Sequence, residues 1–203
     1  QGTFIDTVLS GSINYDDLVK EGKIEKSYKQ HMFLSPQNIH TDFKYNINKI
    51  ACHLSHMKTL EKFLDSKNNI CLILEDDIKM KDKENTLQHL KNILKHLPKD
   101  WEYINLGRCW DYCDQDEKIN EYIIKSKRAL CRHAYIVNKK GAKKILDYCL
   151  PMKNYPGDVH YVEIINKKLL NGYSSKKSVF FQNRQELGSY LGNNKAIQTC
   201  VSK

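Results

Sequence analysis

A short apolar run that ends in three adjacent acids constrains this chain more than any other feature of its sequence. Residues 70–74 read Ile-Cys-Leu-Ile-Leu, and Glu75, Asp76 and Asp77 follow without a break. A continuous apolar run of this length is typical of a strand that is buried on both faces. In open α/β sheets, ligands bind beyond the carboxyl ends of the strands. We therefore expect a buried central strand that carries three carboxylates to a binding site.

Predicted helices and strands alternate along the rest of the chain. Apolar residues three and four positions apart indicate helices over residues 49–64, 83–97, 138–150 and 159–170. Short apolar runs indicate strands over residues 103–106, 122–124, 134–137 and 179–181. Residues 22–48 show no such pattern, and we expect a surface loop there. The alternation predicts an α/β sandwich, and the length of 203 residues fits one domain over residues 1–203.

Some residues of these helices have predicted roles. A further short helix is expected after Asn14, running to Glu21. The side chains of Asn14 and Asn138 are suited to accept hydrogen bonds from the first turns of the helices that follow them. The inward side of the helix over residues 83–97 is expected to consist of Leu87, Leu90, Ile93, Leu94 and Leu97.

The chemistry of the three acids favours a bound cation. Adjacent carboxylates repel one another, and a hard divalent cation with oxygen ligands is the simplest way to hold them together. Mg²⁺ or Mn²⁺ at this place would bridge the phosphates of a nucleotide diphosphate and stabilise it as a leaving group. The alternative is a solvated strand end, because acids are common in loops.

The net charge of the chain excludes few classes of binding partner. The formal net charge is +9, but the lysines are scattered in pairs rather than gathered in a stripe with aromatic residues, so we expect no nucleic-acid partner. No apolar run approaches the roughly 18–20 residues that cross a bilayer, although peripheral membrane contact is compatible with the charge. We favour a cytoplasmic location, in a bacterium or a virus-infected host cell. The lumen of the endoplasmic reticulum is the alternative if an upstream signal has been removed.

Seven cysteines leave the redox compartment undecided. Cys109, Cys113 and Cys131 are spaced for one disulfide, or for a metal site with His133. Cys52, Cys71 and Cys149 lie in apolar patterns and are expected to be small core residues.

Two segments carry a resemblance to a known family. Residues 51–58, Ala-Cys-His-Leu-Ser-His-Met-Lys, followed by the run that ends in the three acids, resemble glycosyltransferase family 25. That family includes lipooligosaccharide galactosyltransferases and collagen hydroxylysine galactosyltransferases. The likeness continues at residues 101–107, 133–142 and 151–158, and in all it covers roughly residues 45–190.

The resemblance implies a GT-A-like (Rossmann-like) fold with a mixed central sheet, a UDP-sugar donor, Mn²⁺ (or Mg²⁺) dependence and inversion at the anomeric carbon. It implies transfer of a hexose, galactose or glucose, to a hydroxyl group of a glycan or of hydroxylysine in a collagen-like protein. By position, Asp77 and Glu75 resemble the metal ligands, and Glu75 and Asp76 would also face the ribose, the base or metal-bound water.

Further site residues follow from the same resemblance. Asp158 is the candidate general base for the acceptor hydroxyl, with Glu163 in reserve, and the alternative for Asp158 is a helix cap. His56, and less so His53, would lie near the donor on the helix before the acidic strand, where each could equally be structural. The closing part of the site would come from Gln182, Ser189 and Tyr190.

One departure from the family weighs against activity. Family members normally begin with a strand that reads like Ile-Asn-Leu and is followed by paired arginines. Residues 4–12 resemble the second strand and turn of the family instead, so we expect the first strand to be missing. The alternative function is therefore a reduced, catalytically inactive relative that keeps the fold as a binding or assembly module.

Overall fold

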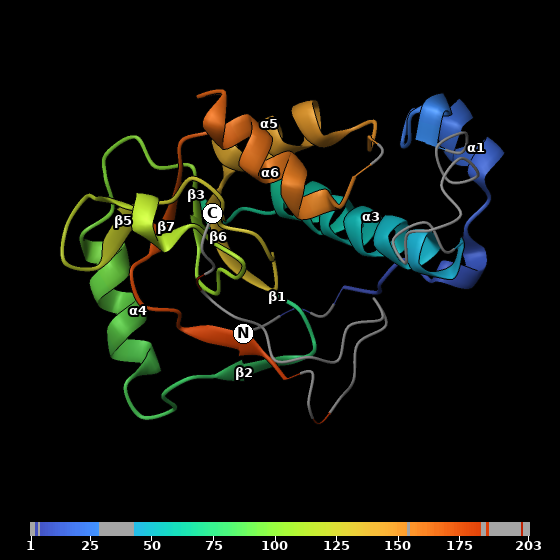
Figure 1. The fold of residues 1–203 in the computed structure, drawn as a ribbon. Coiled ribbons are helices and arrows are strands. Elements are labelled where there is room, and N and C mark those ends of the chain that lie inside the picture. Colours follow the sequence, from blue (N-terminus) through green and yellow to red (C-terminus); the bar gives the residue numbers. More distant parts are fainter. Residues whose placement is uncertain are drawn as a thin grey trace.

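A six-stranded mixed sheet lies at the centre of the protein (Figure 1). The computed structural model describes residues 3, 5–28, 43–153, 155–183, 186 and 200, without the side chains of residues 43–46. The strand order is β1-β6-β3-β7-β5-β4, and only the β3–β7 pair is parallel. The strands are β1 (Ile70–Leu74), β3 (Tyr103–Asn105), β4 (Glu117–Lys118), β5 (Ile123–Lys125), β6 (Ala134–Asn138) and β7 (Gly172–Ser175). A separate antiparallel pair consists of β2 (Ile78–Met80) and β8 (Phe180–Gln182).

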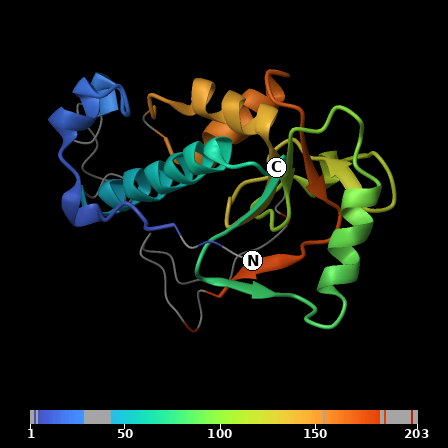
Figure 2. The same cartoon turned by 180° about the vertical axis from the view of Figure 1, so that it is seen from behind.

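Helices cover both faces of the sheet, which confirms the predicted α/β sandwich and is consistent with a Rossmann-like fold (Figures 1 and 2). On one face lie α3 (Phe43–Asp65), α5 (Lys139–Cys149) and α6 (Gly157–Asn166), and on the other lies α4 (Thr86–Lys95). The first core joins Met57, Leu60, Ile145 and Ile164 of the helices to Ile73, Tyr135 and Val137 of the sheet. The second core joins Ile93 of α4 to Ile104, Ile123, Ile136 and Phe180. No helix among the described residues is long and apolar enough to cross a membrane.

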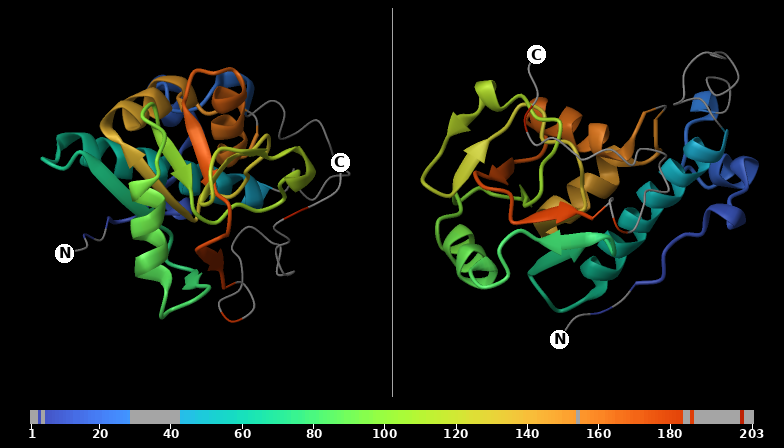
Figure 3. Two further views of the ribbon diagram at one scale, coloured as in Figure 1. Left: turned by 90° about the vertical axis from the view of Figure 1, so that its left-hand side faces the viewer. Right: turned by 60° about the horizontal axis from the view of Figure 1, so that its bottom comes forward.

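A third, smaller core lies at the far end of α3 from the sheet, where α1 (Tyr15–Lys20) packs (Figure 3). The Asn14 side chain caps α1 by accepting hydrogen bonds from the next turn, as predicted. Ile24 and Tyr28 are buried in this core, and α3 begins at Phe43. The predicted loop over residues 22–48 is therefore wrong at both of its ends, while residues 29–42 lie outside the described part of the chain.

The first strand is an edge strand, which corrects the prediction of a buried central one. Among the described residues β1 pairs with β6 alone, and Ile70, Leu72 and Leu74 are 48%, 42% and 43% exposed. Ile73 faces the first core and is buried. The second core contains no β1 residue because α4 packs over the inner strands. An apolar run of five residues thus did not require burial on both faces.

Other differences have local causes. α4 exposes Leu87 and Leu94, because its buried line runs through Thr86, Leu90 and Ile93 instead. β7 was not predicted, since its buried Gly-Tyr-Ser-Ser sequence has no apolar run. α6 ends at Asn166, four residues earlier than expected, where Lys168 turns the chain with a φ of 60°. Residues 5–9, expected to resemble a strand, form none, and the Val8 amide instead donates to Ser55 Oγ of α3.

Candidate active site

The three acids, called the acidic run (Glu75, Asp76 and Asp77), form the turn between β1 and β2. The turn is anchored by its backbone on both sides. The Glu75 amide donates to the His133 carbonyl at 2.8 Å, and the Asp77 carbonyl accepts from the Asn183 amide at 2.7 Å. The run is therefore fixed to the start of β6 and to the end of β8, which come much later in the chain.

Gln182, the last residue of β8, connects the first and third acids. Its Nε2 donates to Glu75 Oε2 and to Asp77 Oδ2, each at 3.1 Å. The structure thus brings Gln182 to the acidic run. Asp76, between the two, is exposed. Ser189 and Tyr190, the other closing residues that we expected, lie outside the described residues.

A second group of side chains holds the other oxygen of Glu75. His56 Nε2 lies 2.9 Å from Glu75 Oε1, and Cys52 Sγ lies 3.9 Å from the same oxygen. Cys52 and His56 are four residues apart on α3, so both side chains project from one face of that helix. The other ring nitrogen of His56, Nδ1, lies 3.1 Å from the Tyr135 hydroxyl.

The protonation states of this group follow from burial and charge. Burial raises the pKa of the Glu75 carboxyl, but the hydrogen bond from His56 and nearby positive charges outweigh it and lower the pKa to about 2. Burial lowers the pKa of His56, and Arg132 lowers it further. Glu75 is therefore charged at neutral pH, and a neutral His56 donates its Nε2 hydrogen to it. The Tyr135 hydroxyl then donates to Nδ1.

The residues of the acidic run fit a hard divalent cation. One oxygen of Glu75 and one of Asp77 converge on a single nitrogen that carries a partial positive charge. Oxygen donors of this kind are what Mn²⁺ and Mg²⁺ prefer. Asp77 is better suited than Glu75 to bind such an ion directly, because His56 and Cys52 engage the other oxygen of Glu75, while Gln182 contacts both carboxylates.

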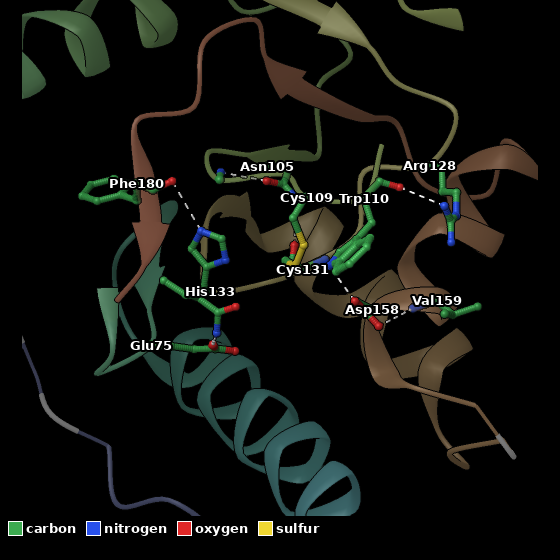
Figure 4. The surroundings of a disulfide bond; sticks show 12 residues. Glu75, Asn105, Cys109, Trp110, Arg128, Cys131, His133, Asp158, Val159 and Phe180 are labelled. Atoms are coloured by element: carbon green, nitrogen blue, oxygen red, sulfur yellow. Dashed lines mark hydrogen bonds between the residues drawn. A yellow bond between two sulfur atoms is a disulfide. The ribbon is translucent and has the colours of Figure 1, made fainter. Parts of the chain in front are cut away.

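The segment of residues 131–133 connects the acidic run to the start of α6 (Figure 4). At one end of it the His133 carbonyl accepts from Glu75, and at the other the Cys131 amide donates to Asp158 Oδ2 at 3.0 Å. Cys131 has a φ of 65°, in the left-handed region, which turns the chain between these two bonds. In Figure 4, Glu75 and Asp158 lie to either side of the disulfide that includes Cys131.

Arg132, in the middle of this segment, is almost fully buried. Its Nη1 donates to His53 Nδ1 at 3.2 Å, and its guanidinium lies over the Tyr161 ring, 5.0 Å from the ring centre. Since His53 Nε2 lies 2.9 Å from the Cys149 carbonyl, a neutral His53 donates there and accepts from Arg132. Burial lowers the pKa of His53 well below its usual value, in agreement with this arrangement.

The two predicted base candidates occupy different surroundings on α6. The Asp158 carboxylate accepts from the Cys131 amide and from the amide of its neighbour Val159. The predicted alternative of a helix cap is wrong, because Asp158 is the second residue of α6 and Pro156 stands at the N-cap without a side-chain hydrogen bond. Glu163 accepts from the Tyr155 hydroxyl and pairs with Lys167 and Lys153. The hydrogen bonds from Lys167 and Tyr155 lower the pKa of Glu163 to about 2.

Two disulfides cross the loop after β3. They join Cys109 to Cys131 and Cys113 to Cys200. The sequence alone suggested one disulfide among the first three of these cysteines and gave no partner in the C-terminal segment. The alternative of a metal site built from these cysteines and His133 is wrong, because all of their thiols are used in disulfides. Cys52, Cys71 and Cys149 are free, and of these only Cys149 is fully buried.

Comparison with known proteins decides the family. The model of glycosyltransferase family 25, described as LPS biosynthesis protein, matches residues 13–161. The chain belongs to glycosyltransferase family 25. Membership makes it a glycosyltransferase, with a sugar donor and a glycan acceptor. The matched range contains the acidic run, His56 and Asp158, whereas Glu163 and Gln182 follow it. No curated protein matches the chain.

Three residues at the site escaped the sequence analysis of this glycosyltransferase. Cys52 precedes His56 by one helical turn, so the spacing on α3 could have indicated it. For Arg132 and Tyr135, no spacing to neighbouring residues in the sequence indicates a place at the site. They reach the site because β6 lies beside β1, and only the strand order determines that.

Proposed function

We propose that this chain is a metal-dependent, inverting glycosyltransferase that moves a hexose, galactose or glucose, from a UDP-sugar to a hydroxyl group. The acceptor would be a glycan or a hydroxylysine of a collagen-like protein. The observation that carries the proposal is the convergence of the Glu75 and Asp77 carboxylates on the Gln182 amide at the end of β1. Carboxylates at the end of a sheet strand suit a cation and a diphosphate together.

The proposed roles divide among the three acids. Asp77 would bind Mn²⁺ (or Mg²⁺) directly, and Glu75 would contribute the oxygen that faces Gln182. Asp76, which is exposed, would face the ribose or metal-bound water. When bound, the cation would stabilise the departing nucleotide diphosphate. His56 would act through Glu75, whose charge it stabilises by its hydrogen bond.

We favour Asp158 over Glu163 as the base that takes the proton from the acceptor hydroxyl. A general base works best with a pKa near the working pH. Lys167, Tyr155 and Lys153 lower the basicity of Glu163, whose pKa is about 2. Asp158 is held by two backbone amides, and it is linked to the acidic run through residues 131–133.

The first test is calorimetric titration of UDP into the protein, with and without Mn²⁺. We expect Mn²⁺-dependent binding that is lost in Asp77→Asn, a change that keeps the shape of the side chain but removes its charge. Glu61→Gln is the matched control, because Glu61 is an exposed acid on α3. Circular dichroism would check that each variant is folded.

The outcomes separate the two readings of the family resemblance. Binding that needs both Mn²⁺ and Asp77 supports an active donor site, and screens of UDP-galactose, UDP-glucose and acceptors would follow. Absence of UDP binding by the folded wild-type chain in the presence of Mn²⁺ would contradict the proposal. The inactive binding or assembly module would then be the better description.

We also propose that the protein works in an oxidising compartment, such as the lumen of the endoplasmic reticulum, rather than in the cytoplasm. The two disulfides support this location, because disulfides persist mainly where glutathione does not reduce them. Titration of thiols in the unfolded, non-reduced protein should count three free groups, those of Cys52, Cys71 and Cys149. A count of seven would contradict the proposed compartment.

A further inference from the structure

Glu75 presents its two carboxylate oxygens to two chemically different surroundings. Oε2 faces the amide of Gln182 and, beyond it, the carboxylate of Asp77. Oε1 faces the imidazole of His56 and the thiol of Cys52. The first side offers oxygen ligands alone, whereas the second combines sulfur, nitrogen and oxygen. The proposed donor site uses only the first side.

We propose that Cys52, His56 and Glu75 form a binding site for a thiophilic divalent cation of the Zn²⁺ class, next to the proposed Mn²⁺ site. The ligand atoms Sγ, Nε2 and Oε1 all lie within 4.8 Å of one another. Zn²⁺ with bonds of about 2.0–2.3 Å in a tetrahedron separates its ligands by about 3.3–3.7 Å. The observed separations from Oε1, 2.9 Å to His56 and 3.9 Å to Cys52, bracket that range.

The framework around the three ligands is already arranged for a cation. Cys52 and His56 are one turn apart on α3, and Glu75 follows β1 in a turn fixed by its backbone. His56 Nδ1 lies 3.1 Å from the Tyr135 hydroxyl, a contact of the kind that orients a metal-binding imidazole. Gln182 holds the other oxygen of Glu75. His56 and Glu75 are thus each positioned by a neighbour outside the site.

The binding step balances without any further reactant. The Cys52 thiol loses its proton to solvent as the sulfur–metal bond forms. His56 gives up its hydrogen bond to Glu75, carries its proton on Nδ1 and donates it to the Tyr135 oxygen. Three protein ligands leave one position of a tetrahedral ion for water or a donor oxygen.

Arg132 carries a positive charge close to this site, and its geometry limits the effect of that charge on a bound cation. Its Nη2 lies 4.0 Å from Cys52 Sγ as a weak hydrogen-bond donor. Donation to the sulfur favours the thiolate, the form that binds metal. Burial and the Glu75 charge outweigh it and raise the pKa of the Cys52 thiol to about 12, so the ion itself must drive the loss of the proton. The guanidinium also lies over the Tyr161 ring and donates to His53, which hold it in place. The thiolate and the Glu75 carboxylate together balance the two charges of the metal.

The test is titration of Co²⁺ into the metal-free full chain, because Co²⁺ replaces Zn²⁺ and a cobalt–thiolate bond absorbs in the near ultraviolet. We expect one equivalent to produce this band and Zn²⁺ to abolish it. Cys52→Ser should lose the band, and Cys71→Ser, which changes a free cysteine of β1, should keep it. Tyr135→Phe should weaken Co²⁺ binding by about 10- to 100-fold.

Further variants distinguish failure of this proposal from failure of the proposed function. Asp77→Asn should keep the cobalt band even where Mn²⁺-dependent UDP binding is lost. An equal band in Cys52→Ser, or no band from the folded wild-type chain, would overturn the site. Should Cys52→Ser fail to fold, X-ray absorption of the Zn²⁺-loaded wild-type protein decides. One sulfur ligand supports the site, and a shell of oxygen and nitrogen alone overturns it.

Discussion

Two glutamates of this protein have a pKa of about 2, and they reach it in different ways. Glu75 is mostly buried, and uncharged donors, the His56 imidazole and the Gln182 amide, hold it at the end of β1. The Glu163 side chain on α6 is 26% exposed, close to the 23% of Glu75, but it pairs with the lysines Lys167 and Lys153. The hydrogen bond from His56 and nearby positive charges, that of Arg132 among them, lower the pKa of Glu75, whereas hydrogen bonds from Lys167 and Tyr155 lower the pKa of Glu163.

This difference indicates which of the two carboxylates is suited to bind a cation. A mostly buried carboxylate whose hydrogen-bond donors are neutral keeps a negative charge that can bind a cation. The same donors limit how far the carboxylate can move. A carboxylate paired with exposed lysines contributes little to stability and is a weak base. We therefore expect changes at Glu75 to affect both folding and ligand binding, and changes at Glu163 to affect neither strongly.

The largest expected effect is that of Glu75→Ala on stability. The change leaves the donors of His56 and Gln182 without their acceptor in a mostly buried place. We expect a loss of about 3 kcal/mol in the free energy of unfolding, measured by urea denaturation. A loss below about 1 kcal/mol would mean that the buried carboxylate is no better integrated than Glu163.

Gly157→Ala tests the packing at the start of α6, the helix that carries Glu163, against His53 and Arg132. A β-carbon at this position would lie 2.3 Å from His53 Nδ1 and 2.5 Å from Arg132 Nη2, so both buried side chains would have to move. We expect a loss of about 1–3 kcal/mol in the free energy of unfolding. Gly11→Ala is the matched control, since no atom lies within 4 Å of a β-carbon there, and an equal loss in both variants would contradict the packing.

Acid should weaken the protein through its buried histidines. Burial, together with Arg132, lowers the pKa of His160 to about 4 from an ordinary value of 6.5, and the pKa values of His53 and His56 are lowered too. Below pH 6.5 the unfolded chain therefore binds protons that the folded chain does not, and stability falls until about pH 4. His160 alone should lower the free energy of unfolding by about 2 kcal/mol as the pH falls from 7 to 5.

Urea denaturation at a series of pH values measures this loss, and His160→Gln should make the dependence shallower. Glu75 extends the same trend to lower pH, because its stabilising charge is lost as pH falls from 4.5 towards 2. Unchanged stability between pH 7 and 5 would mean that these histidines are not neutral and buried as described.

The smallest expected effect is that of Glu163→Gln. The lysines around Glu163 are 38% and 59% exposed, so water and salt screen these ion pairs. We expect a change of less than about 1 kcal/mol in the free energy of unfolding, and UDP affinity close to that of the wild type. A strong loss of transfer activity with normal UDP binding would instead return Glu163 to the role of base.

Much of the fold was predictable because it depends on neighbours in the chain. The spacing of apolar residues located α3, α4 and α5, and Asn14 and Asn138 cap their helices as expected. The acidic run, together with residues 51–58, also led to the family that the comparison shows. Periodicity, capping and short motifs are local properties, so a single sequence can reveal them.

Only the tertiary structure determined the remaining features of the fold and the site, because these features depend on which distant segments come into contact. The apolar run of β1 did not reveal that the strand lies at the edge of the sheet, since burial of its outer side depends on where α4 packs. Gln182 lies 107 residues after Glu75, and β8 brings it there by pairing with β2. The partner of Cys113 is likewise Cys200. Such contacts between distant residues are set by packing and strand order, which no local pattern encodes.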